Sequence, residues 1–127
     1  MVHFVHLPDC HVGAWRDTRM RELNLKHFVK AVDDILKTHQ EDQYDFIIIA
    51  GDLFNTALPS VDALKTVTEQ LRRIYTIGIP VYGIAGSHDY SASGKSMLEV
   101  LEKAELFINV MRGEVVDDIL NLSFVAD

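Results

Sequence analysis

The sequence lacks a second cysteine and any long apolar run, and each absence excludes a class of protein. Cys10 is the single cysteine among 127 residues, so no internal disulfide can form, which favours a reducing, cytoplasmic location. The apolar runs at 46–50 and 79–85 are far shorter than the roughly 20 residues of a membrane-spanning helix. The N-terminus has neither the basic region nor the cleavage site of a signal peptide. We therefore expect no membrane association.

An excess of positive charge is also missing. The chain has 19 acidic and 12 basic residues and a net charge of −7, which argues against a broad basic surface for nucleic acid. A local phosphate site is compatible with this charge, because bound divalent cations reverse the sign of the potential around them. The segment 16–30 is locally basic, and we interpret its charges as those of a solvated helix: Arg16, Arg19, Arg21, Lys26 and Lys30.

Strand-like and helix-like segments alternate along the chain and predict an α/β fold. Strands are expected at 2–7, 44–50, 80–85 and 106–111, and helices at 19–38, from Ser60 to Gly78 and at 96–104. This order implies a largely parallel sheet with right-handed crossovers, flanked by helices. The first two runs are almost continuously apolar, which predicts strands buried on both faces. Residues 115–125 indicate one or two further strands. Because that segment looks unfinished, we expect 1–127 to be the N-terminal part of a longer domain.

Three of the predicted strands end in residues that bind metals or transfer protons. The first runs into Asp9 and His11, the second into Gly51 and Asp52, and the third into the segment 86–89. Ligands of open α/β sheets bind beyond the carboxyl ends of the parallel strands. If the three strands are neighbours, Asp9, His11, Asp52 and His88 converge at one edge, which indicates a metal site for hydrolytic chemistry.

The first junction has two interpretations. In extended backbone, residues two apart point to the same side, so Asp9 and His11 can reach one ion while Cys10 points away. A carboxylate with an imidazole suits Mn²⁺, Fe²⁺ or Zn²⁺. The alternative is an Asp that caps a turn beside a surface His. We interpret Cys10 as a small buried hydrophobe, with a thiolate ligand as the other option.

The other two junctions are also ambiguous when each is taken alone. Asp52 follows an isoleucine-rich strand and needs a cation, backbone donors or solvent, or it is a simple turn residue. His88 is a candidate general acid whose tautomer Asp89 would fix, or it is a solvent-facing loop histidine. His6 lies three residues before Asp9 and is expected to support the ligands through a hydrogen bond.

The segments 6–13, 50–55 and 86–89 resemble the opening motifs of the calcineurin-like metallophosphoesterases. The sequence around the second segment and the helix after Gly94 is similar to the branch of DNA double-strand-break-repair nucleases (SbcD-like). The resemblance covers nearly the whole chain but only the first half of the phosphoesterase domain of that branch. It implies half of an αββα sandwich.

The resemblance also implies two divalent metal ions, with Mn²⁺ as the expected metal. Asp9 and His11 would bind the first ion, Asp52 would bridge both, and the Ser87 position would contribute to the second. Such a pair of ions clamps the attacking and leaving oxygens of a phosphoryl transfer and supplies a hydroxide.

The remaining implications concern catalysis and partners. His88 would contact the scissile phosphate or protonate the leaving group, and Asp89 would hold His88. The implied substrate is DNA and the implied partner an SMC-type repair ATPase. A homodimer through the second and third helices is also implied.

Two departures from the family pattern limit these implications. Ser87 stands where the family usually has Asn, and no histidine follows His88, so the later imidazole ligands are absent. We therefore expect these 127 residues alone to bind Mn²⁺ weakly or singly and to cleave DNA inefficiently. Two alternatives stay open: a phosphoesterase of the same superfamily that acts on nucleotides or phosphoproteins, and a non-catalytic module for dimerisation or partner binding with a vestigial metal site.

Overall fold

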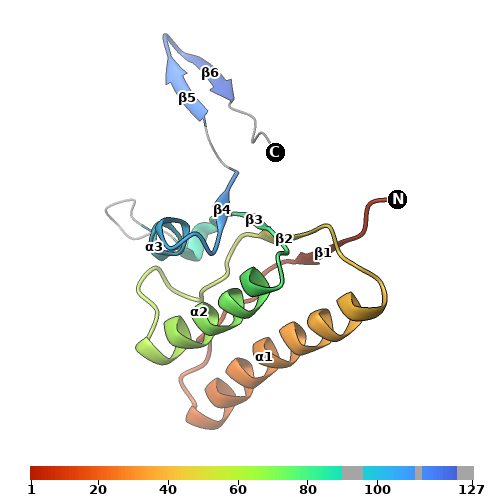
Figure 1. Cartoon of the computed structure of the whole chain (residues 1–127). Helices are drawn as coiled ribbons and strands as arrows, with labels where there is room; N and C mark the ends of the chain where they lie inside the picture. Colours follow the sequence, from red (N-terminus) through yellow and green to blue (C-terminus); the bar gives the residue numbers. More distant parts are fainter. Residues whose placement is uncertain (90–95, 111–112, 123–127) are drawn as a thin grey trace.

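The computed structural model describes residues 1–89, 96–110 and 113–122. Its main sheet has four parallel strands in the order β1 (Phe4–Leu7), β2 (Phe46–Ala50), β3 (Val81–Ile84) and β4 (Ile108–Asn109). The predicted α/β fold with a parallel sheet is confirmed. Two strands, β5 (Gly113–Val116) and β6 (Ile119–Leu122), form a separate antiparallel hairpin, drawn apart from the sheet in Figure 1. Of the predicted loop and final strand, residues 90–94 and 123–125 lie outside the described ranges.

The predicted helices are also found, with capped ends. Helix α1 (Thr18–Glu41) begins at Asp17, whose carboxylate accepts the N–H groups of Arg19 and Met20. Helix α2 (Val61–Thr76) begins at Ser60, as the sequence predicts, and α3 is Met97–Lys103. None of the described helices is both long and apolar enough to cross a bilayer.

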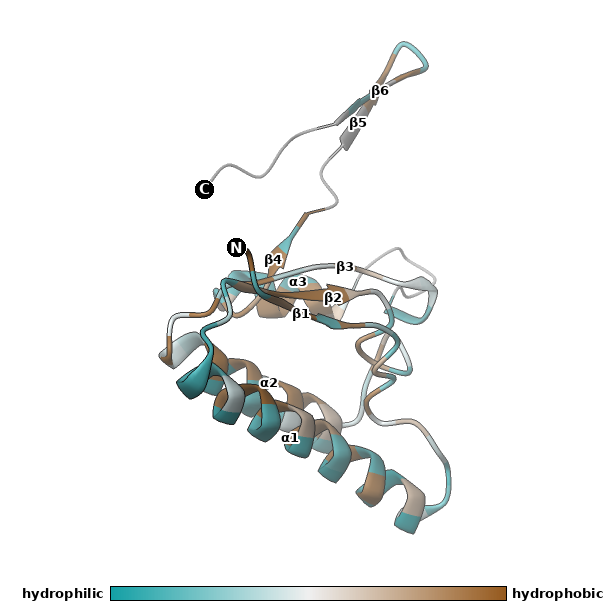
Figure 2. Ribbon diagram, turned by 90° about the vertical axis from the view of Figure 1, so that its right-hand side faces the viewer, coloured by the Kyte–Doolittle hydropathy of each residue, from teal (hydrophilic) through white to brown (hydrophobic). Residues whose placement is uncertain are grey.

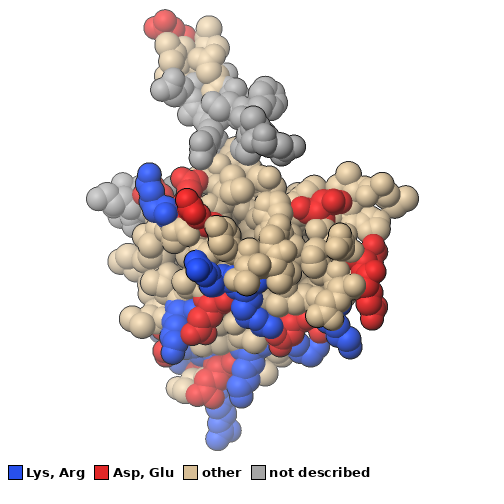
Figure 3. Space-filling view, viewed as in Figure 1, with Lys and Arg blue, Asp and Glu red and all other residues tan. Residues whose placement is uncertain are grey.

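The basic residues of the segment 16–30 lie on the surface, four of them exposed and Arg21 half-buried. Figure 3 shows Lys and Arg interleaved with Asp and Glu on the visible face of the two long helices. Lys30, for example, pairs with Asp34 at 3.3 Å. The interpretation as solvated helix charges is confirmed for Arg19, Lys26 and Lys30. Arg16 lies before α1, and the Arg21 guanidinium donates to the carbonyls of Trp15 and Arg16.

Helices α1 and α2 cover one face of the sheet (Figure 2). On that side Ile47, Ile49 and Val81 are buried against apolar residues of both helices. The opposite side of the sheet is still apolar but open: Phe4 is 51% exposed and stacks on Phe46 with ring centroids 5.2 Å apart. The expectation that the first two strands are buried on both faces is therefore wrong for the described residues. One helical layer on one sheet is half of the expected αββα sandwich.

The register of the three main strands places their ends at one edge of the sheet. Leu7 pairs with Ile49, and Ala50 pairs with Ile84, so β1, β2 and β3 stop almost level with one another. Three segments leave this carboxyl edge: the first loop (9–13), the second loop (51–55) and the third loop (86–89). Backbone pairing continues between the first two, where the N–H of Val12 donates to the carbonyl of Leu53 at 2.9 Å.

Strand β3 fits closely between its neighbours at Gly83, which generates a first prediction. A Cβ at this position would lie 2.6 Å from the Phe107 ring and 2.7 Å from the Ile49 carbonyl oxygen. We expect Gly83→Ala to lower the free energy of unfolding by about 1–3 kcal/mol, because the core cannot make room cheaply. Chemical denaturation of Gly83→Ala, of Phe107→Leu and of the variant with both substitutions measures this loss.

The control is Gly78→Ala, where φ is +84° and no atom lies within 4 Å of the added Cβ. Gly78→Ala should lower the free energy of unfolding by about 1 kcal/mol, because alanine is strained in left-handed backbone. This loss should simply add to the loss caused by a second substitution, Phe107→Leu. The loss from Gly83→Ala should instead shrink when it is combined with Phe107→Leu. Additive losses at Gly83 would contradict the proposed collision with the Phe107 ring.

Candidate metal centre

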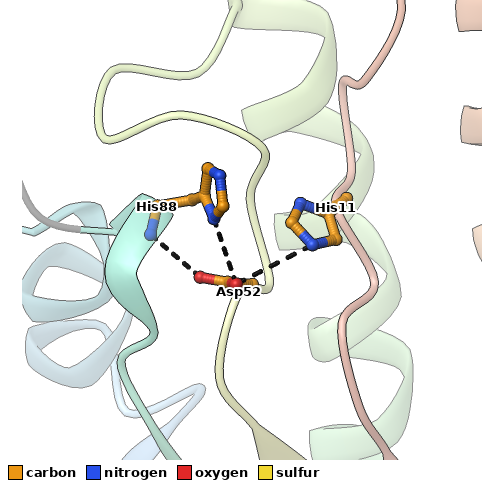
Figure 4. A group of neighbouring side chains, drawn as sticks. All are labelled: His11, Asp52 and His88. Carbon is orange, nitrogen blue, oxygen red and sulfur yellow. Dashed lines mark hydrogen bonds and ion pairs between the residues drawn. The ribbon is translucent and has the colours of Figure 1, made fainter.

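Three of the side chains expected to converge meet at the carboxyl edge. His11 comes from the first loop, Asp52 from the second and His88 from the third, and they face one another in Figure 4. One ligand atom from each lies within 4.8 Å of the others. The rings of His11 and His88 meet edge to face, with centroids 5.0 Å apart. The three strand ends thus bring together groups that are far apart in sequence.

Asp52 is the centre of this cluster. Its Oδ1 accepts the backbone N–H of His88 at 2.9 Å, and its Oδ2 lies 3.1 Å from Nδ1 of the His88 ring and 3.7 Å from Nε2 of His11. The His88 N–H, followed by the His88 ring, holds the pKa of the Asp52 carboxyl below its ordinary value of 3.8, although partial burial opposes this. Asp52 is therefore an anion at neutral pH.

His11 is oriented by a residue that sequence reasoning missed. Its Nδ1 lies 3.1 Å from Oδ1 of Asn55. Because the amide oxygen only accepts, Nδ1 carries the proton, which leaves Nε2 as the nitrogen that faces Asp52 and is placed to bind an ion. The sequence signal for Asn55 is weak: it is an amide three residues after Asp52 in the same loop.

Asn24 on α1 fixes the first loop from the other side. Its amide accepts the N–H of Gly13 at 2.9 Å and donates to the His11 carbonyl at 3.3 Å. No sequence pattern marked this residue, since it is a polar position on an amphipathic helix. The backbone around His11 is therefore held by a side chain on α1 and by the ladder to the second loop.

The backbone of the candidate ligands differs from the extended geometry that the sequence pattern suggests. Asp9, His11 and Asp52 have φ values of 46°, 45° and 48°, in the left-handed region. Asp9 and His11 still lie close, with 3.9 Å between Oδ1 and Nε2, but the two-residue alternation is not the reason. The Asp9 side chain is 70% exposed, so it faces solvent as well as the cluster. Non-glycine residues in this region are strained and concentrate at functional sites.

Cys10 is not suited to bind a metal. It packs against the hydrophobic core, and burial, reinforced by the charges of Asp9 and Asp89, raises the pKa of its thiol to about 11. A thiolate ligand needs deprotonation, which this environment opposes. The interpretation of Cys10 as a small hydrophobe agrees with these findings.

Asp89 does not hold His88, which corrects the expectation from the sequence. Its side chain is only 1% exposed and points inward, where its oxygens accept the N–H groups of Gly86 at 2.8 Å and Phe54 at 3.2 Å. The single turn of 3-10 helix at 87–89 rotates the carboxylate away from the preceding imidazole. Asp52 takes the place beside the His88 ring.

Two further candidates lie at the edge of the cluster or outside it. Ser87 is exposed, and its Oγ lies 3.3 Å from Nδ1 of His88. His6 is exposed on β1, and its side chain makes no hydrogen bond to any residue that the structure describes. Their roles as a second-ion ligand and as a supporting residue stay predictions.

The donor set fits a divalent transition metal. Ligand atoms around one ion, each at roughly 2.0–2.2 Å, lie about 3–4 Å from one another. The distances from Nε2 of His11 to the oxygens of Asp52 and Asp9, 3.7 and 3.9 Å, agree with this spacing. Imidazole nitrogen with carboxylate oxygen suits Mn, Fe or Zn better than Ca or Mg.

Comparison with known proteins agrees with this geometry. Residues 2–125 match the family described as calcineurin-like phosphoesterase. The chain is 32% identical over 122 residues to the DNA double-strand break repair protein Mre11 of Archaeoglobus fulgidus, covering 91% of this chain and 27% of the relative. It is 32% identical over 126 residues to SbcD, a subunit of the nuclease SbcCD of Staphylococcus epidermidis, covering 95% and 32%. The chain thus spans about a quarter to a third of the length of these curated relatives.

Cys10 generates the first prediction at this site. Cys10→Ala should leave the affinity for Mn²⁺ unchanged within about twofold, because the protonated thiol is not a ligand. Calorimetric titration measures the affinity. In the unsubstituted protein, the rate of alkylation by iodoacetamide should keep rising with pH toward the thiol pKa of about 11. A large loss of affinity in the variant, or a rate that levels off near pH 8, would contradict the assignment.

Asp52 generates a prediction about pH. Because its pKa is lowered in the folded state, the ionised carboxylate stabilises the fold above the unfolded-state pKa of about 4, and this contribution is lost as pH falls through the folded-state pKa. In metal-free buffer, unfolding free energies of the wild type and Asp52→Asn should differ most near neutral pH and converge in acid. Asn tolerates the left-handed backbone, so the comparison reports the charge. A difference that grows on acidification would refute this.

Proposed function

The chain belongs to the calcineurin-like phosphoesterase family, and we propose that it serves as part of a metal-dependent phosphodiesterase that cleaves DNA in double-strand-break repair. The cluster of His11, Asp52 and His88 at the carboxyl edge of the sheet is the observation that carries the proposal. The names of the relatives, a DNA double-strand break repair protein and a nuclease subunit, support the substrate class.

Asp9, His11 and Asp52 would hold a first divalent ion, and Asp52 and Ser87 would hold a second. When bound, such ions lower the pKa of water and polarise the phosphoryl oxygens. Manganese is the proposed metal. The chain's own contribution is a set of ligands fixed before binding: Asn55 sets the tautomer of His11, and the first loop is tied to the second by backbone hydrogen bonds.

His88 is the proposed general acid. Asp52 engages its Nδ1, which leaves Nε2 for the substrate, and the side chain is 53% exposed beside the cluster. In the doubly protonated ring, Asp52 holds the Nδ1 proton while the Nε2 proton passes to the leaving oxygen. Asp52 thus takes the orienting role that the sequence pattern gives to Asp89.

The proposal includes partners and an incomplete ligand set. An SMC-type repair ATPase is the proposed partner, in keeping with a relative named as one subunit of a nuclease. A homodimer through α2 and α3 is also proposed, and the exposed apolar side chains of Val61 and Val100 on these helices support it. No histidine follows His88 in the sequence, so these 127 residues alone should bind one cation weakly and cleave DNA inefficiently.

The leaving group offers the sharpest test of this proposal. In the context of a complete phosphoesterase domain, His88→Gln should slow Mn²⁺-dependent cleavage of labelled DNA about 10²-fold or more, since the leaving alkoxide needs a proton. With bis-p-nitrophenyl phosphate, whose leaving group needs none, the loss should stay below about tenfold. Initial rates on both substrates measure the difference.

The matched control is His27→Gln, an exposed histidine on α1 away from the cluster, which should leave both rates unchanged. Equal losses on both substrates would refute the general-acid role. A preference for nucleotides or phosphoproteins over DNA would favour another phosphoesterase of this family. Absence of saturable Mn²⁺ binding would indicate a non-catalytic module.

A further inference from the structure

The three loops at the carboxyl edge are joined in two different ways. Backbone hydrogen bonds connect the first loop to the second: the N–H of His11 donates to the Asp52 carbonyl at 2.9 Å, and the N–H of Asn55 donates to the Val12 carbonyl at 3.2 Å. Among the described residues, no backbone pair connects the second loop to the third. Side-chain carboxylates make that connection instead.

The two carboxylates act reciprocally. Asp52 of the second loop accepts the N–H of His88 in the third loop at 2.9 Å. Asp89 of the third loop accepts the N–H of Phe54 in the second loop at 3.2 Å. Each loop therefore holds the backbone of the other through one acidic residue. If the connection from Asp89 is lost, the hydrogen bonds left between these two loops are those that Asp52 itself makes to His88.

These two connections differ in what else they can bind. The oxygens of Asp52 lie in the cluster of candidate ligands, so a bound cation would compete with the His88 N–H for them. The carboxylate of Asp89 is 1% exposed, and its oxygens accept two backbone N–H groups, from Phe54 and Gly86. None of the ion pairs among the described residues involves Asp89. A buried carboxylate is costly unless hydrogen bonds compensate it, and these bonds are of the strong, charge-assisted kind.

We infer that Asp89 is a positioning residue whose buried carboxylate fastens the third loop to the second, so that Asp52 and His88 keep their spacing while the Asp52 oxygens bind a cation. This rests on the proposed function only in taking the cluster as a cation site. Phe54 is a suitable anchor, because it is 1% exposed within the core. The third loop also lies directly against the ligand, since a Cβ on Gly86 would collide with Asp52. A small shift of this loop therefore changes the site.

The test is Asp89→Asn, which keeps the shape of the side chain but replaces one accepting oxygen with an amide group that cannot accept an N–H. We expect the affinity for Mn²⁺, measured by calorimetry on the folded protein well below its melting temperature, to fall about tenfold or more. The matched control is Asp33→Asn, which removes an exposed carboxylate that pairs with Arg73 at 2.6 Å and should leave the affinity unchanged. A lowered melting temperature with unchanged affinity would overturn the inference, because it would indicate a structural role alone.

Amide hydrogen exchange in the unsubstituted protein tests the same inference should the variant not fold. With and without Zn²⁺, a diamagnetic probe, the amides of Phe54 and Gly86 should stay protected, while the amide of His88 should lose protection as the cation engages Asp52. A Phe54 amide that exchanges as fast as an open loop, or that loses protection with Zn²⁺, would overturn the inference. Neither measurement involves DNA cleavage, so a failure here is distinct from a failure of the proposed nuclease activity.

Discussion

The parallel register of β1, β2 and β3 is the constraint on which the candidate centre depends. Parallel strands that pair level with one another must leave the sheet at the same edge, so the residues that follow them become neighbours whatever their separation in sequence. The core behind this edge is formed by α1 and α2 on one face of the sheet. Packing thus fixes the strands, and the strands fix where His11, Asp52 and His88 meet.

Electrostatics then determines what these neighbours can do. Asp52 keeps its negative charge because it accepts the His88 N–H and faces two imidazoles, whereas Cys10 keeps its proton because it is buried beside two carboxylates. The same edge therefore separates a charged acceptor at the surface from a neutral thiol behind it. Asp89 shows a third solution, a buried carboxylate that backbone donors satisfy. The arrangement presents negative charge and imidazole nitrogen outward, as a site for a divalent cation requires.

The sequence predicts this fold and the convergence of the site because both follow from the order of strands and helices. It predicts less where contacts depend on the path of a loop. Asn55 as the partner of His11 and the inward turn of Asp89 arise from tertiary geometry that no spacing rule encodes. The error about strand burial has a different cause: an apolar run shows that both faces of a strand are apolar, but not that a second layer covers both. Phe4 and Phe46 stack on the open face for this reason.

The left-handed backbone at Asp9, His11 and Asp52 connects these observations. Such a conformation costs on the order of 1–3 kcal/mol for a non-glycine residue, although Asp and His tolerate it better than most. It persists here because the ladder between the first two loops and the hydrogen bonds from Asn24 hold the chain in place. The chain thus adopts this strained conformation when it folds, and ligand binding does not have to impose it. A cation or a phosphate would then bind to groups already in position, and its binding energy would not be spent on ordering the loops.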